Sequence, residues 1–252
     1  MNLANLDKGK IMAGILTMIY GSVAYLAGFL TLLYAIGFVG DFAVPKTINT
    51  GNAGDITSSI IINLVVLTLF ALQHSIMARP AFKKWWAQFV PEYLERSTYV
   101  LLTAIVLTIL YWQWQPMTSI VWHIENNIGV IVIKGLFWSG WIILFVSTFM
   151  ISHADLFGLR QVFLKFKNQE YLNLDFKISG FYKLVRHPIM TGIIIAFWAT
   201  PHMTTGHLLF ASVSTAYILV ALQFEEHDLM NLFGEKYADY KRKVSMLFPL
   251  KF

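Results

Sequence analysis

The heptapeptide RHPIMTG, from Arg186 to Gly192, places an arginine, a histidine and a proline directly before the apolar run IIIAFWA. Pro188 suits the first turn of a helix, where its missing N–H is not needed, so we expect a helix to begin there. His187 then lies near the helix N-cap, where unpaired N–H groups favour an anion. Arg186 adds a planar set of donors suited to a carboxylate, and Gly192 allows close approach to the helix. The pattern favours a site for a charged small molecule, and a snorkelling arginine beside a capping histidine is the alternative.

A second cluster, FEEHDL, stands where a long apolar run ends. Its adjacent carboxylates, Glu225 and Glu226, are costly near a bilayer unless they are solvated or paired. One of them could pair with Arg186 while the other binds a ligand hydroxyl or amine. The alternative is an ordinary solvated helix exit. The following stretch LFGEKYADYKRKV carries Tyr237 and Tyr240 among basic residues, which is typical of an interfacial amphipathic helix.

A third cluster, SHADLFGLRQ, closes the fourth apolar run. A carboxylate beside a histidine can orient the imidazole and stabilise its charged form, so His153 and Asp155 are candidates for a general base. Their spacing does not put them on one helix face, so a pairing requires the helix to loosen there. Arg160 follows as a nearby cation. A plain helix end is the alternative.

A fourth candidate, His74, lies within the second apolar run, in the segment LQHSIMARP. A titratable residue inside a membrane segment is by default a candidate for function. Hydrogen bonding between helices is the alternative explanation. His123, His202 and His207 fall at the opposite ends of the helices and are not candidates.

The composition excludes several classes of protein. The chain has 252 residues, of which 57% are hydrophobic and 13% charged, whereas soluble domains average about 45–50% apolar and about 25% charged residues. It is therefore expected in a membrane.

The chain contains no cysteine, so its own residues provide no disulfide, thiolate nucleophile or iron–sulfur cluster. Its seven histidines show no close ligand spacing, and we expect no structural metal. The net charge of +5 fits cytoplasmic loops better than nucleic-acid binding.

A segment needs about 20 apolar residues to cross a bilayer. We predict such segments at residues 11–39, 56–77, 98–114 and 128–152. The last apolar region, 189–224, is interrupted by TPHMTTGH, and each half is short for a full crossing, which predicts a helical hairpin. The first run is too long for a signal-peptide core, and we expect it to be retained. The sequence thus predicts an all-α integral membrane protein: a helical bundle of about five to six membrane segments, ending in a hairpin and a cytoplasmic C-terminal helical cap.

The basic residues predict how this bundle is oriented. If the predicted helices alternate across the membrane, 17 of the 19 lysines and arginines fall on one side. Cytoplasmic loops carry the excess of Lys and Arg, so we expect both termini in the cytoplasm. The same topology puts RHPIMTG, FEEHDL and HADLFGLRQ on that side. These polar segments could build one cytoplasmic site.

Two of these motifs together resemble a known signature. RHPIMTG, followed after one hairpin by EEHDLMNLFGEKYADYKRKVSMLFP, resembles the C-terminal signature of the isoprenylcysteine carboxyl methyltransferase and phospholipid methyltransferase superfamily over residues 180–249. Met190 departs from it, because the carboxyl methyltransferases commonly carry tyrosine there. Further segments, QHSIMARPAFKKWW, ERSTYVLL and HADLFGLRQ, resemble the methanethiol S-methyltransferase family and, less completely, the NnrU-like membrane proteins. With them the resemblance spans nearly the whole chain.

The resemblance implies S-adenosylmethionine as the methyl donor and methanethiol, which becomes dimethyl sulfide, as the acceptor. It implies one methyltransferase domain, with residues 1–155 as the transmembrane bundle and 156–252 as the cofactor-binding part. The implied cofactor residues are Tyr182, Val185, Arg186, His187, Pro188, Gly192, Glu225 and Glu226, with Tyr237 and Tyr240 as walls against water. An isoprenylcysteine or a phospholipid headgroup is an alternative acceptor. A haem-binding membrane isomerase, with His74 as axial ligand, is the alternative from a different class.

The chemistry of methyl transfer to a thiol indicates two further requirements of the site, which are alignment of the reacting atoms and a general base. Alignment of the two sulfurs with the methyl group can lower the barrier by about 7–11 kcal/mol. A thiol with a pKa near 8.5 is mostly protonated at neutral pH, so a general base should help by about 10²–10⁴-fold. His153 and Asp155 are the leading candidates for this base, followed by His74, and Arg160 completes the predicted catalytic set.

Overall fold

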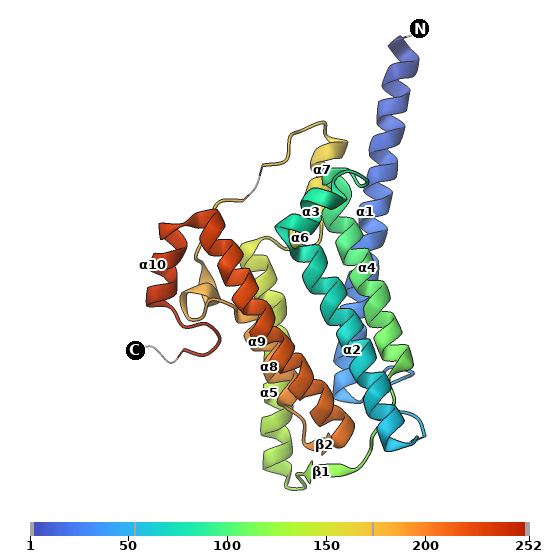
Figure 1. Ribbon diagram of the computed structural model, residues 1–252, viewed down its shortest axis with the longest axis vertical. Coiled ribbons are helices and arrows are strands. Elements are labelled where there is room, and N and C mark those ends of the chain that lie inside the picture. Colours follow the sequence, from blue (N-terminus) through green and yellow to red (C-terminus); the bar gives the residue numbers. More distant parts are fainter. Residues whose placement is uncertain (1–2, 53, 173, 250–252) are drawn as a thin grey trace. The chain divides into compact units, whose positions relative to one another are not determined.

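The computed structural model describes residues 3–249 except 53 and 173, and long apolar helices dominate it (Figure 1). Within the described residues, five helices are long and apolar enough to cross a membrane: α1 (Leu3–Gly40), α2 (Ile56–Ala78), α4 (Glu92–Gln113), α5 (Asn127–Ile151) and α9 (Thr205–Phe233). Their apolar side chains are largely exposed, as expected where lipid replaces water as the solvent. The predicted all-α integral membrane bundle is confirmed.

Shorter elements connect or cap these five helices. Four of them lie outside the apolar runs: α3 (Pro80–Trp86), α6 (His153–Leu156), α7 (Leu159–Phe166) and the 3-10 helix η1 (Gly180–Lys183). The C-terminal region adds α8 (Pro188–Trp198) and α10 (Glu235–Lys243), the latter being the predicted C-terminal helical cap. Two short strands, β1 (Ile120–His123) and β2 (His202–Thr204), pair antiparallel.

The predicted hairpin is confirmed, with α8 and α9 as its arms, but the second arm is not short. It has 29 residues, because the helix continues through its two glutamates and ends at Phe233. The third membrane helix likewise begins at Glu92 rather than at 98, since a first turn with two glutamates is a favourable helix start that hydropathy does not detect. The strand pair was not predicted either, because β1 and β2 are far apart in the sequence.

By contacts the described chain divides into two compact units. One comprises Met1–Tyr34, Thr68–Leu110 and Ser152–Asp175, and the other Ala35–Leu67, Tyr111–Ile151 and Phe176–Phe252. We call them unit 1 and unit 2.

In unit 1, α1 lies along α4 (Figure 1). The Tyr20 hydroxyl is 2.9 Å from that of Thr98. A Cβ added to Gly28 would approach within 2.6 Å of Val100, and one added to Gly21 within 2.5 Å of Val162 on α7. Small residues on α1 therefore let α4 and α7 pack closely against it, as is common between helices in membranes.

In unit 2, α5, α8 and α9 run side by side, with β1 and β2 at one end (Figure 1). Ile218 and Leu222 on α9 pack with Leu247 of the tail, and Ile193 on α8 lies against this cluster. The tail therefore packs onto the hairpin. At the strand pair, the Nδ1 atoms of His123 and His202 lie 2.9 Å apart.

Gly192 on α8 is expected to be essential for packing, because it meets α5 directly. A Cβ at this position would lie 2.5 Å from the carbonyl oxygen of Gly140 and 2.8 Å from the backbone nitrogen of Leu144. Backbone atoms cannot move aside cheaply, so Gly192→Ala should lower the free energy of unfolding by about 1–3 kcal/mol, the usual cost of overpacking. Thermal unfolding in detergent measures this loss. Gly135→Ala is the matched control on α5, where a Cβ meets nothing within 4 Å, and equal effects of the two variants would contradict the expectation.

Candidate functional sites

The segment before α8 is held by the C-terminal tail. Val185 forms a parallel bridge with Ser245, and the backbone N–H groups of Arg186 and His187 donate to the carbonyls of Ser245 and Met246 at 2.8 and 3.1 Å. His187 is the N-cap of α8 and Pro188 its first residue, as predicted. These main-chain bonds orient the RHP motif before any side chain contributes.

The predicted ion pair forms, and its partner is Glu226. The Nε and Nη2 atoms of Arg186 both donate to Glu226 Oε1 at 2.6 Å, and His187 Nε2 lies 3.2 Å from the same oxygen. The Nζ of Lys241 on α10 lies 2.8 Å from Glu226 Oε2. Arg186 and Glu226 are buried, with exposed fractions of 8% and 3%. Each neutralises the charge of the other, which would be costly to bury alone.

Arg186 also fixes the end of α10. Its Nη1 donates to the carbonyl of Lys241 at 3.3 Å and to that of Val244. A guanidinium that bonds the last carbonyls of a helix compensates their missing partners and the negative end of the helix dipole. Arg186 and Glu226 therefore join the start of α8, the body of α9 and the end of α10.

Glu225, the neighbouring carboxylate, is in a different environment. Its side chain is 46% exposed, and its Oε1 lies 3.9 Å from His187 Nδ1, beyond hydrogen-bonding distance. The fold thus uses one glutamate of the pair internally and leaves the other accessible at the edge of the cluster. That division of roles was anticipated, but which glutamate takes which role was not.

Three tyrosines border this cluster. The Tyr240 hydroxyl donates to the carbonyl of Tyr182 at 2.5 Å, and Phe176 packs against the rings of Tyr237 and Tyr240. Burial raises the pKa of Tyr240 to about 12 and raises the pKa values of Tyr182 and Tyr237 further. All three are therefore uncharged at neutral pH. The Tyr237 hydroxyl lies near the Arg186 guanidinium but is buried without a well-formed hydrogen bond to any described residue.

The predicted general-base pair, His153 and Asp155, lies on α6 in unit 1, and its two members have different partners. His153 Nε2 is 3.1 Å from the Tyr25 hydroxyl, and its ring packs against Phe157 with centroids 4.7 Å apart. Burial lowers the pKa of His153. The imidazole is therefore held, uncharged at neutral pH, by aromatic neighbours.

Asp155 instead bonds Arg160 and Tyr171. Arg160 Nη1 donates to Asp155 Oδ1 at 2.9 Å, and the Tyr171 hydroxyl donates to Oδ2 at 3.3 Å. Arg160 also donates to the carbonyl of Leu172 at 3.1 Å. The contacts of this carboxylate thus tie α6 to α7 and to the segment after it, and they do not include the imidazole of His153.

His74 lies on α2 and contacts α4. Its ring stacks on Phe70 with centroids 5.2 Å apart, and the Tyr99 hydroxyl lies 2.9 Å from its ring nitrogens. This is the hydrogen bond between helices that was the alternative explanation for a histidine at this depth. Among the described residues, no cluster of three or more metal-ligating side chains occurs.

Several contributors had no strong signal in the sequence. Lys241 is one of four basic residues in the segment that forms α10, and nothing in the sequence marks it as the partner of Glu226. Tyr25 lies 128 residues from His153 in the chain. Ser245 contributes a backbone carbonyl, which residue types do not reveal. Gly192, expected to allow close approach to the helix, lies directly against α5.

The helices and the polar clusters at their ends define a polytopic α-helical membrane protein with a buried ionic centre. Comparison with known proteins identifies the family, within this class, to which the chain is similar. The family model described as "NnrU protein" matches residues 62–238. The methanethiol S-methyltransferase of Mycobacterium tuberculosis is 52% identical over 93% of this chain and 96% of its own length. Methanethiol S-methyltransferase 2 of Bradyrhizobium diazoefficiens is 51% identical over 96% of this chain and 93% of its own.

The chain belongs to the methanethiol S-methyltransferase family, as its motifs indicated, and the NnrU-like resemblance is confirmed as well. A more distant relative is Nurim of Rattus norvegicus, which is 28% identical over 76% of this chain and 74% of its own length. No solved structure matches the chain.

Proposed function

We propose that this protein transfers a methyl group from S-adenosylmethionine to methanethiol, which yields dimethyl sulfide. The observation that carries this proposal is the 52% identity, over 93% of the chain, to a relative named methanethiol S-methyltransferase. We also propose that one domain, residues 1–252, carries the activity. Both termini and the polar clusters face the cytoplasm in this proposal, since 17 of the 19 lysines and arginines fall on one side of the predicted topology.

The cluster around the RHP motif has the chemistry that the methyl donor requires. S-Adenosylmethionine, when bound, supplies an electrophilic methyl group on a sulfonium. It also carries a carboxylate, an ammonium group and ribose hydroxyls. The accessible Glu225 suits the ammonium or a hydroxyl, and the N-terminal turn of α8, at the positive end of the helix dipole, suits the carboxylate. The buried hydroxyl of Tyr237, which makes no well-formed hydrogen bond to a described residue, is a further polar group that a ligand could satisfy.

Within this proposal the residues have separate tasks. Arg186, His187 and Glu226 hold the pocket rather than the ligand, because their charged atoms already bond one another. Tyr182, Val185, Pro188, Tyr237 and Tyr240 shape its walls and exclude water. His153 accepts the thiol proton, for which an uncharged imidazole is required. Asp155 and Arg160 position α6, and His74 is kept as a second candidate base.

The proposed activity is tested directly with purified full-length protein, methanethiol and S-adenosylmethionine. Headspace gas chromatography should show dimethyl sulfide accumulating with time, at a rate proportional to enzyme and dependent on both substrates. A prenylated cysteine and phosphatidylethanolamine serve as competing acceptors in parallel reactions. Methylation of either one without dimethyl sulfide would overturn the proposed acceptor, and binding of haem without any methyl transfer would overturn the class of reaction.

A further inference from the structure

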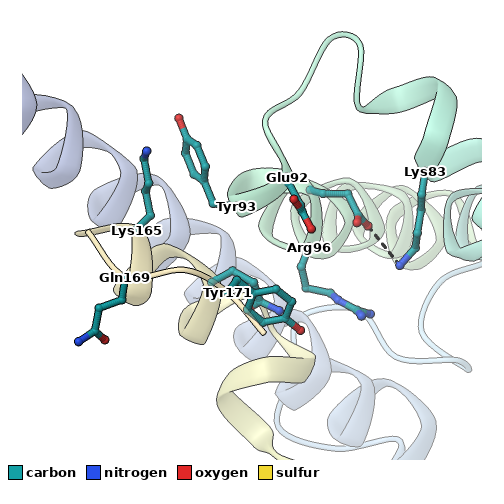
Figure 2. Close-up of a pocket in the computed structure, with 9 residues that line it drawn as sticks. Lys83, Glu92, Tyr93, Arg96, Lys165, Gln169 and Tyr171 are labelled. Carbon is teal, nitrogen blue, oxygen red and sulfur yellow. Dashed lines mark ion pairs between the residues drawn. The ribbon is translucent and has the colours of Figure 1, made fainter. Parts of the chain in front are cut away.

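A polar cavity of about 230 Å³ lies in unit 1, and none of the residues that line it is among those assigned above to the methyl donor. It is lined by side chains from α3, α4, α7 and the segment after α7 (Figure 2). Ligand pockets for whole drug-sized molecules measure about 300–1,000 Å³. This cavity is therefore suited to a fragment such as a headgroup.

The charges around the cavity leave a positive excess. Three cations, Lys83, Arg96 and Lys165, line it together with two carboxylates, Glu92 and Glu95. Lys83 is engaged by Glu95 at 3.4 Å. Figure 2 shows Arg96 extending between Tyr171 and Lys83, and within the described residues no ion pair involves Arg96 or Lys165. A ligand with one negative charge would balance this set.

Lys165 is placed to meet such an anion at the rim. Its Nζ lies 4.9 Å from the centroid of the Tyr93 ring, a cation–π contact that leaves the ammonium donors available. An arginine fork and an ammonium group on one cavity match the oxygens of a phosphate, which accept several charge-assisted hydrogen bonds.

One residue that lines the cavity also carries an unsatisfied acceptor. Gln161 is 5% exposed and lines the cavity. Its Nε2 donates to the backbone carbonyl of Asp155 at 3.3 Å, whereas its Oε1 is buried with no partner among the described residues. A buried acceptor without a partner is costly, so a ligand that donates a hydrogen bond to it would be favoured. The ligand should therefore carry a hydroxyl or amine in addition to its negative charge.

The position of the cavity along the membrane helices indicates where such a ligand comes from. It lies where α2 has ended at Ala78 and α4 begins at Glu92. Between them, α3 and the residues after it carry an aromatic cluster, in which Trp85 and Phe89 are 49% and 65% exposed. Aromatic side chains of this kind mark the level of the lipid headgroups, and basic pockets between helices at that level bind anionic headgroups.

We propose that this cavity binds the headgroup of an anionic phospholipid that also carries a hydroxyl, with Arg96 and Lys165 on the phosphate and Gln161 Oε1 accepting from the hydroxyl. Phosphatidylglycerol has this combination. Phosphatidylcholine has no net charge and no donor. The site does not depend on the proposed methyl transfer, since none of these three residues belongs to the machinery assigned above.

Native mass spectrometry of the full-length protein in a nonionic detergent tests the site. With equal amounts of dioleoylphosphatidylglycerol and dioleoylphosphatidylcholine, the wild type should retain one phosphatidylglycerol with a preference of about tenfold or more, because each charge-assisted hydrogen bond contributes on that scale. The double substitution Arg96→Gln with Lys165→Gln should abolish the preference. Gln161→Leu should reduce it while the attraction for anionic lipid persists.

Lys84→Gln is the matched control, since Lys84 is an exposed cation on α3 that does not line the cavity. It should leave the preference unchanged. Equal retention of the two lipids by the wild type would overturn the proposal, and so would equal behaviour of the double variant and Lys84→Gln. If Gln161→Leu fails to fold, the double variant decides. Displacement of the lipid by excess glycerol phosphate would assign the cavity to a soluble phosphate ester instead.

Discussion

Glu226→Ala is expected to lower the free energy of unfolding by about 3–5 kcal/mol, the usual effect of removing one partner of a buried ion pair. The substitution leaves the buried Arg186 guanidinium without its carboxylate and removes the acceptor of His187 and Lys241. It also releases the contact that joins α8, α9 and α10. Thermal or denaturant unfolding in detergent micelles, followed by circular dichroism, measures the loss.

The neighbouring Glu225 provides the control for this prediction. Its side chain is 46% exposed and makes no short contact with His187, so Glu225→Ala should change the free energy of unfolding by no more than about 1 kcal/mol.

If Glu225 binds the methyl donor, Glu225→Gln should weaken S-adenosylmethionine binding in calorimetry while the unfolding midpoint stays close to that of the wild type. A larger stability loss from Glu225→Ala than from Glu226→Ala would contradict both assignments.

Hydropathy and charge predict much of this molecule, because membrane helices are stabilised by properties that are local in sequence. The apolar runs identified α1, α2, α5 and the hairpin, and Pro188 fixed the start of α8. The chemistry of Arg186 also predicted that a carboxylate would lie beside it. Each of these inferences depends on a segment's own composition or on a single strong electrostatic requirement.

The choice between the two glutamates could not be predicted, since adjacent residues of a helix differ by about 100° in direction and only the packing of α9 decides which one turns inward. The contact of Tyr25 with His153 could not be predicted either, because Tyr25 lies on a helix far away in the sequence. The hydrogen-bond partners of Asp155 were also not predictable. A carboxylate so near His153 in the sequence suggested a general-base pair, but Arg160 and Tyr171 lie in directions that only the folded α6–α7 turn defines.

His153→Ala is expected to lower turnover by about 10²–10⁴-fold, the usual contribution of a general base, while affinity for S-adenosylmethionine is retained. The physical reason is that methanethiol is mostly protonated at neutral pH, so loss of the proton acceptor leaves only the small thiolate fraction to react. Initial rates of dimethyl sulfide formation give the turnover, and calorimetry gives the affinity. His123→Ala, which removes a histidine from β1, is the control and should leave both values unchanged.

The pH dependence provides a second test of the same role. A histidine has an ordinary pKa near 6.5, and burial lowers that of His153. The imidazole accepts a proton only in its uncharged form, so the rate should be maintained down to a pH below about 6.5 and then fall as His153 becomes protonated. Tyr25→Phe, which removes the hydroxyl 3.1 Å from Nε2, should move the pH at which the rate falls without abolishing this fall.

A fall of the rate at low pH that persists unchanged in His153→Ala would assign the base elsewhere, with His74 the next residue to substitute. Equal losses of turnover and of cofactor affinity would instead make His153 a structural residue of α6.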